Sequence, residues 1–166
     1  EDLLDGRTRG SVTMLDRYGE VFAWRGDQFG GQVTAETVAP VLKNAVVATE
    51  DKRFYRHLGV SPRGIASAIA INLREGRSPL SGHGGSTITQ QLVRTTLLSP
   101  SERYEQSYRR KIREAVLAYR LSQTFSKEEI LERYLNEIYF GNLAYGVEAA
   151  SRAYFNKPVG ELNLSE

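Results

Sequence analysis

Two adjacent carboxylates, Glu50 and Asp51, are the side chains of this sequence best suited to proton transfer. They follow an apolar run at helical spacing, residues 41–47, and precede Phe54 and His57. An acidic pair at the end of an apolar helix fits a cleft in which one carboxylate is partly desolvated and acts as an acid or a base. The alternative is that both acids are solvated surface charge and that His57 only caps the end of the helix.

A helix start rich in hydroxyl and amide side chains occupies residues 84–91. Two glycines lead into Ser86, the expected N-cap, so that Thr87 and Gln91 fall in the first turns. The free N–H groups and the positive dipole end of a helix suit a phosphate or a sugar hydroxyl. The alternative is an ordinary capped helix whose polar first turn faces water.

Basic residues gather between Arg94 and Arg120, where seven Lys and Arg side chains stand against three Glu. Arg110 and Glu114 lie four residues apart on one helical face, and Lys111 is adjacent. Two or three cations at one point would bind a diphosphate. The alternative is a set of solvated ion pairs, which are common on helices and contribute little stability.

Composition limits the function classes. The 166 residues suffice for one domain with a core, and the formal net charge of +2 does not indicate a nucleic-acid partner. The absence of cysteine excludes disulfides and thiolate metal sites, and two histidines are too few for a histidine-rich metal site. No apolar run approaches the roughly 20 residues that a membrane-spanning helix needs. The sequence begins without Met and ends like the opening of another helix, so we expect a piece of a longer chain.

Start and stop signals predict a mainly α fold with a small β-hairpin at residues 11–24. We expect a mobile loop at residues 75–85, which hold four glycines and one proline. The longest helix is expected over residues 102–125. The other helices are expected to start at Pro40, Ser61, Ser86, Ser126 and Gly146.

Apolar periodicity predicts which side of each helix faces the core. In the longest helix the expected inward residues are Ile112, Ala115, Val116 and Tyr119. The corresponding residues are Ile65, Ala66, Ile69 and Leu73 after Ser61, and Ile130, Leu131, Tyr134, Leu135 and Ile138 after Ser126. Glu132 and Asn136 share a face from which they could brace a neighbouring loop.

Four motifs follow one another along the chain. They are Glu50-Asp51-x-x-Phe54-x-x-His57-x-Gly59, Gly84-Gly85-Ser86-Thr87-Ile88-Thr89-Gln90-Gln91, Arg110-Lys111-x-x-Glu114 and Lys127-x-x-Ile130-Leu131-x-x-Tyr134-Leu135-Asn136. In this order they resemble the motifs of the peptidoglycan glycosyltransferases, the glycan-polymerising domains of bifunctional penicillin-binding proteins and of monofunctional transglycosylases. The resemblance runs from about residue 41 to the end, and residues 139–155 are similar to the bifunctional members.

The resemblance implies a lysozyme-like, mainly α domain over residues 1–166, with a small membrane-facing jaw at about residues 61–85. It implies polymerisation of lipid II, a disaccharide-pentapeptide on undecaprenyl diphosphate, into β-1,4-linked glycan with inversion and release of undecaprenyl diphosphate. The implied partners are lipid II, the growing glycan, the membrane surface and a transpeptidase domain in the full chain, with no nucleic acid. The implied location is the outer face of the bacterial cytoplasmic membrane, with an N-terminal anchor helix that this fragment lacks.

Carried over by motif position, Glu50 would be the general base that takes the proton of the acceptor's 4-hydroxyl, and Glu114 the second acid of the cleft. Arg94, Arg110 and Lys111 would stabilise the leaving diphosphate. The other residues expected to bind substrate are Asp51, Phe54, His57, Ser86, Thr87 and Gln91. No metal ligands are expected, although a divalent cation, Mg or Mn, could assist the diphosphate as it does in parts of the family.

Packed hydrocarbon on one side of Glu50 is expected to raise its pKa, while the donor-site cations lower it, so that the carboxylate is ionised near neutral pH and still basic. Asp51 is expected to point elsewhere and to accept backbone hydrogen bonds. The sequence departs from the family pattern at two positions. Arg94 stands where Lys is usual, and Gln106 stands where a further Arg is common.

Two other classes remain open. A muramidase or lytic transglycosylase on a lysozyme-like scaffold would use a glutamate as an acid on an existing glycan and would not need the cations. A non-catalytic, glycan-binding scaffold would keep the motifs only as structure. A helical nucleic-acid binder is disfavoured by the balanced charge.

Overall fold

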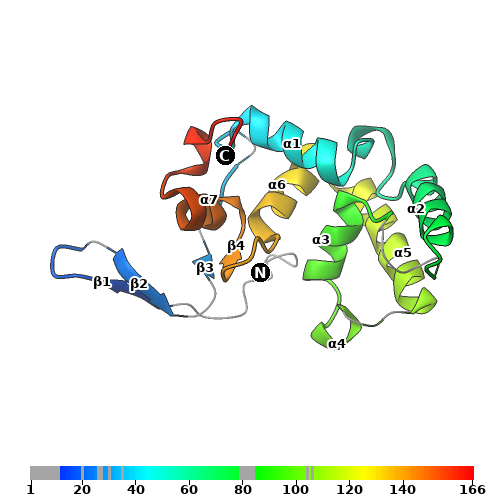
Figure 1. The fold of residues 1–166 in the computed structure, drawn as a ribbon, viewed down its shortest axis with the longest axis horizontal. Helices are drawn as coiled ribbons and strands as arrows, with labels where there is room; N and C mark the ends of the chain where they lie inside the picture. The colour runs from blue at the N-terminus through cyan, green and yellow to red at the C-terminus, as the bar shows by residue number, and fades with distance from the viewer. Residues whose placement is uncertain are drawn as a thin grey trace. The chain divides into compact units, whose positions relative to one another are not determined.

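The computed structural model describes residues 12–19, 21–25, 28–29, 31–34, 36–78, 85–103, 105 and 107–166. The α-helices of these residues are α1 (Pro40–Glu50), α2 (Pro62–Arg74), α3 (Ile88–Thr96), α4 (Pro100–Arg103), α5 (Tyr108–Thr124), α6 (Lys127–Glu137) and α7 (Val147–Phe155) (Figure 1). The strands are β1 (Val12–Leu15), β2 (Val21–Arg25), β3 (Gln28–Phe29) and β4 (Ala144–Tyr145), and two 3-10 turns are η1 (Phe54–Arg56) and η2 (Val159–Glu161). The mainly α fold class expected from the sequence is confirmed.

Residue contacts divide the chain into two compact units. The first consists of the residues up to Lys43 together with Glu132–Glu166, and the second of Asn44–Leu131. Both boundaries fall inside helices, within α1 and within α6. All the motif residues proposed for chemistry belong to the second unit.

The predicted hairpin forms in the first unit, where β1 pairs antiparallel with β2 and Val12 lies opposite Arg25. The Gly19 N–H donates to the carbonyl of Asp16 at 3.1 Å, and the Tyr18 N–H donates to the Asp16 carboxylate at 2.8 Å. Gly19 has a φ of 86°, a backbone conformation that favours glycine. These contacts close the turn, and the hairpin prediction is confirmed.

The first unit also joins β3 and β4 in a short parallel pair, on which α7 packs. Ala144, Ala149 and Ala150 are buried where the helix meets the strand, because their small side chains permit a close approach. Asn136 of α6 donates to the carbonyl of Val33 at 2.8 Å and accepts from the Val33 N–H at 2.9 Å. The expectation that Asn136 braces a neighbouring loop is thereby confirmed.

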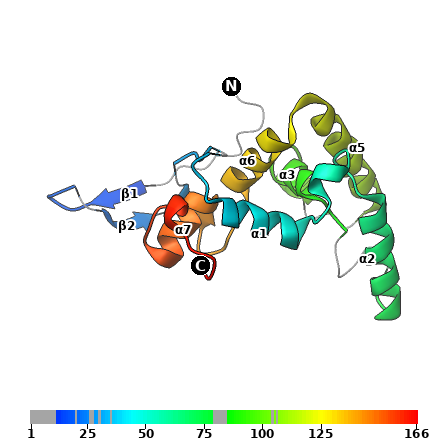
Figure 2. The same cartoon turned by 90° about the horizontal axis from the view of Figure 1, so that it is seen from above.

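In the second unit α3 packs along α5 (Figure 2). The buried apolar side chains of this unit include Phe54, Ile88, Leu92, Val93, Leu98, Ala118, Leu121, Ile130 and Leu131. The loop after α1 passes against α5 at Gly59, where a Cβ would lie 2.3 Å from the carbonyl oxygen of Ala118 and φ is +78°. Only glycine fits both the space and the backbone conformation, so this residue fixes the path of the loop.

The inward face predicted for the longest helix is wrong. Ile112, Val116 and Tyr119 are 65%, 46% and 49% exposed. The residues that α5 buries are Glu114, Ala118 and Leu121. Because two cations neutralise Glu114, its side chain can be buried despite its charge, and the small Ala118 permits the close approach of the loop at Gly59. The apolar stripe is consequently turned outward.

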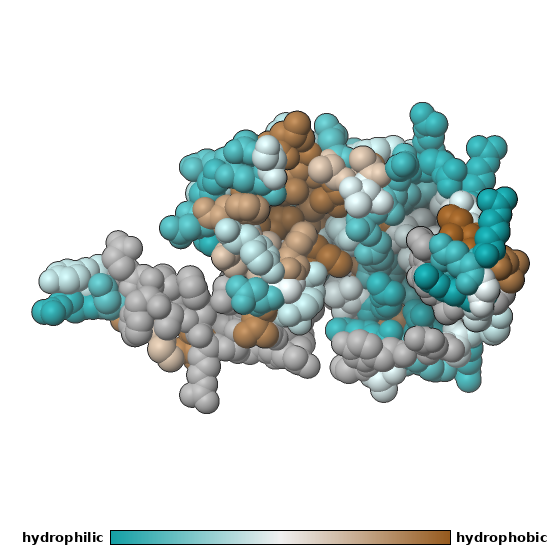
Figure 3. Space-filling model, in the orientation of Figure 1, coloured by the Kyte–Doolittle hydropathy of each residue, from teal (hydrophilic) through white to brown (hydrophobic). Residues whose placement is uncertain are grey.

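The inward face predicted for α2 is also wrong in large part. Ile65 is 37% exposed and Leu73 is 59% exposed, and Ala66 is exposed as well. The buried residues of α2 are Ala68 and Asn72. Figure 3 shows apolar surface over this helix, among hydrophilic side chains. No helix among the described residues has the length and apolar character needed to cross a bilayer.

The capping predictions have mixed outcomes. Ser126 and Glu129 form the expected capping box, since Ser126 N–H donates to the Glu129 carboxylate at 2.7 Å and Glu129 N–H donates to Ser126 Oγ at 3.2 Å. The cap of α3 is Thr87 and not Ser86. The helix predicted over residues 102–125 is interrupted, because α4 ends at Arg103 and Ser107 caps a new helix, α5.

Residues 79–84 lie outside the described residues. The predicted mobility of the loop at residues 75–85 therefore stays a prediction. So does the assignment of residues 61–85 to a membrane-facing jaw, of which the structure describes α2 and its flanks.

Candidate active site

Glu50 is the last residue of α1, and its side chain is exposed. The amide Nε2 of Gln91, on α3, donates a hydrogen bond to Glu50 Oε2 at 2.9 Å. The hydrocarbon wall expected on one side of Glu50 stays a prediction, since Val46 and Val47 before it are half-buried. The carboxylate is exposed and oriented by an amide donor, which leaves it accessible to a substrate hydroxyl.

Asp51 lies directly after Glu50 and points into the protein, with 8% of its surface exposed. His57 Nε2 lies 2.9 Å from both carboxylate oxygens, and the Ile88 N–H donates to Asp51 Oδ2 at 3.2 Å. Ile88 is the first residue of α3, so the negative charge sits at the positive end of this helix. The expectation that Asp51 points away from Glu50 and accepts a backbone hydrogen bond is confirmed.

Thr87 joins the loop at residues 51–59 to the start of α3. Its hydroxyl donates to the carbonyl of Gly59 at 2.5 Å and accepts from the Gln90 N–H at 3.1 Å. The Gln90 side chain accepts from the Thr87 N–H at 3.1 Å, which completes a capping box. Thr87 is 2% exposed, so its contacts hold the loop against the helix and leave no surface for a substrate.

Phe54 and His57 are also inner parts of this loop. Phe54 is fully buried, with its ring at 6.5 Å from that of His57. Lys127 Nζ lies 4.6 Å from the centre of the Phe54 ring and donates to the carbonyl of His57 at 2.7 Å. Burial lowers the pKa of Lys127 below its ordinary value, although Asp51 opposes the shift. Lys127 opens the fourth of the sequence motifs, but sequence reasoning gave it no role, because a lysine at the start of a helix does not reveal which loop it will contact.

Glu114 is fully buried on α5 and both of its oxygens are engaged by cations. Arg110 Nη1 lies 2.5 Å from Oε2, and Lys111 Nζ lies 3.2 Å from Oε1. Lys111 also donates to Ser86 Oγ at 2.7 Å, and Arg110 Nε donates to the carbonyl of Glu105. The structure therefore brings four of the predicted site residues into one cluster, formed by Ser86, Arg110, Lys111 and Glu114.

The cluster has one more positive than negative charge. The Arg110 side chain is 9% exposed and that of Lys111 is 28% exposed, so Lys111 is the more accessible cation. A buried carboxylate between two cations holds them in fixed positions, since removing it would leave them uncompensated. In this geometry Glu114 contacts both cations and the cluster keeps a net positive charge, which could bind an anion such as a diphosphate.

Arg94 lies in the last turn of α3 and is half-buried. It is three residues after Gln91, on the same side of the helix. Within the part of the chain that the structure describes, no hydrogen bond or ion pair holds its guanidinium. That Arg94, Arg110 and Lys111 reach the same diphosphate stays a prediction.

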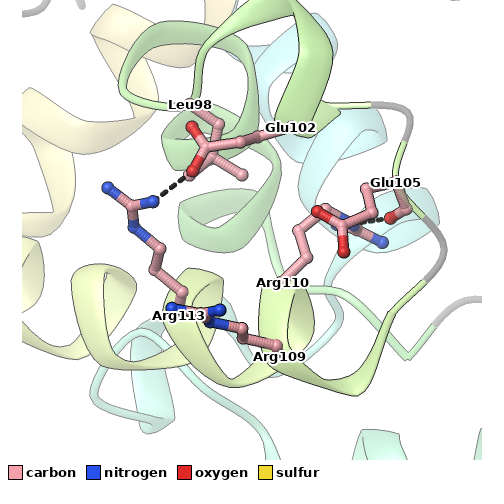
Figure 4. A pocket seen from close by; sticks show the side chains of 6 residues that line it. All are labelled: Leu98, Glu102, Glu105, Arg109, Arg110 and Arg113. Carbon is pink, nitrogen blue, oxygen red and sulfur yellow. Dashed lines mark hydrogen bonds and ion pairs between the residues drawn. The ribbon is translucent and has the colours of Figure 1, made fainter.

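A pocket of about 260 Å³ lies between α4 and α5, and the sequence gave no indication of it. Its lining residues are Leu98, Glu102, Glu105, Arg109, Arg110 and Arg113. Figure 4 shows the three arginines projecting from α5 and Glu102 pairing with Arg113. The pocket was missed because the sequence predicted one continuous helix here. Gln106, where the family commonly has Arg, lies outside the described residues.

The cluster does not fit a divalent cation. Its carboxylate, Glu114, already has both oxygens against Arg110 and Lys111, which would repel a metal ion. Among the described residues, no three His, Asp or Glu side chains gather in a way that could hold a metal.

A mainly α domain that combines an accessible carboxylate with a helix-borne cluster of cations has the parts needed to transfer a group from a phosphorylated donor. The chain belongs to the transglycosylase family, because the family model described as Transglycosylase matches residues 19–166. The recognition made from the four motifs is thereby confirmed.

Among similar proteins is penicillin-binding protein 1A of Escherichia coli strain K12, 44% identical over 164 residues, which are 99% of this chain and 18% of that protein. Penicillin-binding protein 1A of Aquifex aeolicus is 44% identical over 153 residues, 92% of this chain and 20% of that protein. The protein of the same name from Neisseria cinerea is 43% identical over 155 residues, 93% of this chain and 18% of that protein. The chain thus spans about a fifth of the length of the curated relatives it matches.

Proposed function

We propose that this domain polymerises lipid II into β-1,4-linked glycan strands of peptidoglycan. Membership of the transglycosylase family supports the reaction class. The observation that carries the proposal is that the two glutamates, Glu50 and Glu114, have different environments. Glu50 is exposed and oriented by Gln91, whereas Glu114 is buried and holds Arg110 and Lys111.

In the proposed step, Glu50 takes the proton from the 4-hydroxyl of the acceptor's GlcNAc while that oxygen attacks C1 of the donor's MurNAc. The new bond joins the acceptor oxygen to C1, and the bond that breaks joins C1 to the diphosphate oxygen. The electron pair leaves with undecaprenyl diphosphate, and the attack from the opposite face converts an α-linked donor into a β-linked glycan. A single base and a stabilised leaving group suffice for this displacement.

The cations serve the leaving group. Lys111 and Arg110 are fixed by Glu114, so their charge is already in place when negative charge develops on the diphosphate. Lys111 donates a hydrogen bond to Ser86 Oγ, which supports a position for Ser86, two residues before α3, beside the same anion. We place Arg94 at the donor site as a further cation.

The other predicted substrate-binding residues divide into two groups. Ser86 and Gln91 are partly accessible: we propose that Ser86 contacts the donor, whereas Gln91 donates a hydrogen bond to the proposed base, Glu50. Asp51, Phe54, His57 and Thr87 are buried or nearly so, and we propose that they act by holding the loop at residues 51–59.

We further propose that the membrane-facing surface is α2. Its exposed apolar side chains Ile65, Ile71 and Leu73 support this placement. An N-terminal anchor helix, a location at the outer face of the cytoplasmic membrane and a transpeptidase domain in the full chain belong to the same proposal. The long relatives, of which this chain covers about a fifth, are consistent with a further domain.

The test is polymerisation of labelled lipid II by the full-length protein and its Glu50→Gln variant. Loss of a positioned general base should lower turnover by about 10²–10⁴ without lowering the melting temperature. Glu36→Gln is the matched control, because Glu36 is exposed and outside the candidate site. A Glu50→Gln protein with wild-type turnover would reject the assignment of the base. Solubilisation of purified sacculi would instead identify a muramidase.

A further inference from the structure

Lys127, the first residue of α6, directs its ammonium group into the loop that follows Glu50. Nζ donates a hydrogen bond to the carbonyl oxygen of His57 at 2.7 Å and lies 4.6 Å from the centre of the Phe54 ring. A carbonyl oxygen and an aromatic face both attract a cation. The ammonium therefore fixes two points of the loop at residues 51–59, and one of them, Phe54, is fully buried.

Two further contacts tie this loop to the start of α3. His57 Nε2 contacts both carboxylate oxygens of Asp51 at 2.9 Å, and Asp51 accepts the N–H of Ile88 at 3.2 Å. The Thr87 hydroxyl donates to the Gly59 carbonyl at 2.5 Å. A displacement of the loop would therefore displace the first turn of α3, because both contacts end at residues of that turn.

We propose that Lys127 is a positioning residue for the glycosyl transfer: it fixes the loop that fixes α3, whose Gln91 orients Glu50. Gln91 lies one turn after Thr87 and donates to Glu50 at 2.9 Å. The inference rests on the proposed function, since it takes Glu50 to be the base. Lys127 acts through these contacts and does not touch the substrate.

The charges around Lys127 explain why an ammonium group is needed there. Asp51 and Glu128 attract the positive charge, while partial burial disfavours it and lowers the pKa of the amine. His57 contributes its carbonyl, and its ring is already paired with Asp51. An uncharged side chain of similar length would lose the attraction to Phe54 and to Asp51. Arginine would keep the charge, the donor and the stacking capacity.

The test compares Lys127→Gln and Lys127→Arg with the unchanged full-length protein, using lipid II turnover and amide hydrogen exchange. Lys157→Gln is the matched control, because Lys157 pairs with Glu166 in the other unit. We expect Lys127→Gln to lower kcat about 10–100-fold with little change in KM, as a misplaced catalytic group does. Exchange should quicken at the Ile88 amide and at residues 51–59. Lys127→Arg should stay within about threefold of the unchanged protein in both readouts, because arginine keeps a positive charge and N–H donors at this position.

The proposal is overturned if Lys127→Gln keeps the turnover of Lys157→Gln, or if its loop and Ile88 amide exchange at the unchanged rate. It is also overturned if Lys127→Arg loses as much turnover as Lys127→Gln, because the charge and the donor would then not be what matters. The two readouts separate this inference from the proposed function. If the unchanged protein does not polymerise lipid II, the proposed function fails, while hydrogen exchange still decides whether Lys127 holds the loop.

Discussion

At the scale of single residues, two neighbouring acids have opposite environments. Glu50 is exposed and accepts a hydrogen bond from Gln91, whereas Asp51 is 8% exposed and contacts His57. The helix α1 ends at Glu50, so the next residue leaves the helical path and its side chain turns inward. The end of one helix thus separates an acid that can exchange a proton with a substrate from an acid that maintains structure.

Lys127 provides a pH-dependent prediction at the same scale. Burial is the main cause that lowers the pKa of Lys127 in the folded protein below its ordinary value of 10.5. At pH values between the lowered pKa and 10.5, the unfolded chain therefore binds more protons at this residue than the folded protein does. Stability must therefore rise with pH across this window. We expect the difference in melting temperature between the unchanged protein and Lys127→Gln to shift in favour of the unchanged protein as pH rises toward 10.

The comparison of melting temperatures ends at pH 10, because Tyr55 also titrates above that pH. Burial, followed by the charge of Glu128, raises its pKa above 10.0, so its contribution to stability is lost as pH rises beyond that value. The measurement is thermal unfolding of both proteins in steps from pH 7 to pH 10. A difference in melting temperature that is flat across these steps would show that Lys127 is not desolvated in the folded protein.

At the scale of elements, local chemistry predicted several helix starts correctly, among them Pro40 of α1 and the Ser61 cap of α2, and it failed where a capping box was overlooked. Ser126 and Glu129 form the predicted box, yet Ser86 was taken as the cap of α3 when the cap is Thr87. The sequence alone could have identified Thr87 as the cap. A capping box has Glu or Gln three residues after the N-cap, and Gln90 stands three residues after Thr87. Ser99 and Glu102 satisfy the same pattern and start α4, which the sequence analysis missed.

The orientation of α5 could not be read from its own sequence. Its apolar stripe predicts one buried face, but the buried face carries Glu114, whose cost of burial is offset by Arg110 and Lys111. Which face is buried depends on α3 and on the loop at Gly59, and both are distant in sequence. Periodicity within a single helix contains no information about such partners.

A pair of substitutions on α5 tests this orientation. Ile112→Gln should change the free energy of unfolding by less than about 0.5 kcal/mol, because the side chain is 65% exposed. Leu121→Ala should cost about 2–4 kcal/mol, since Leu121 is 7% exposed and its loss leaves a cavity. Denaturant unfolding of the two variants gives both numbers. If Ile112→Gln lowered the free energy of unfolding more than Leu121→Ala, the inward face predicted from the sequence would be correct after all.

At the scale of the whole molecule, the candidate site is assembled from distant segments. Glu50 and Gln91 lie 41 residues apart, and Ser86 and Lys111 lie 25 residues apart. The resemblance to a known family predicted that all of these residues belong to one site, whereas composition and periodicity did not. Neither approach could give the contacts, such as the pairing of Lys127 with the His57 carbonyl, because these depend on the folded path of the loop.

The exposed apolar residues of α2 bear on the proposed contact of the whole protein with a membrane. Ile65, Ile71 and Leu73 are 37%, 36% and 59% exposed, so a membrane contact could remove further apolar surface from water. If α2 enters the interface of the membrane that carries lipid II, their burial there stabilises the bound state by about 1.5–3 kcal/mol for each side chain fully removed from water. An aspartate on this helix should then weaken the encounter with membrane-borne substrate and leave the chemistry alone.

We therefore expect Leu73→Asp to raise the KM for lipid II in vesicles about tenfold, which corresponds to about 1.4 kcal/mol, with kcat nearly unchanged. Turnover of a short-chain, detergent-free donor analogue should be unaffected, because that substrate needs no bilayer. Leu15→Asp is the matched control, since Leu15 is 54% exposed and lies on the β1–β2 hairpin. Steady-state kinetics of both variants on both substrates decide the matter. The proposal that α2 contacts the membrane would be rejected if Leu73→Asp and Leu15→Asp raised the KM for lipid II equally. It would also be rejected if Leu73→Asp lowered turnover of the short-chain analogue.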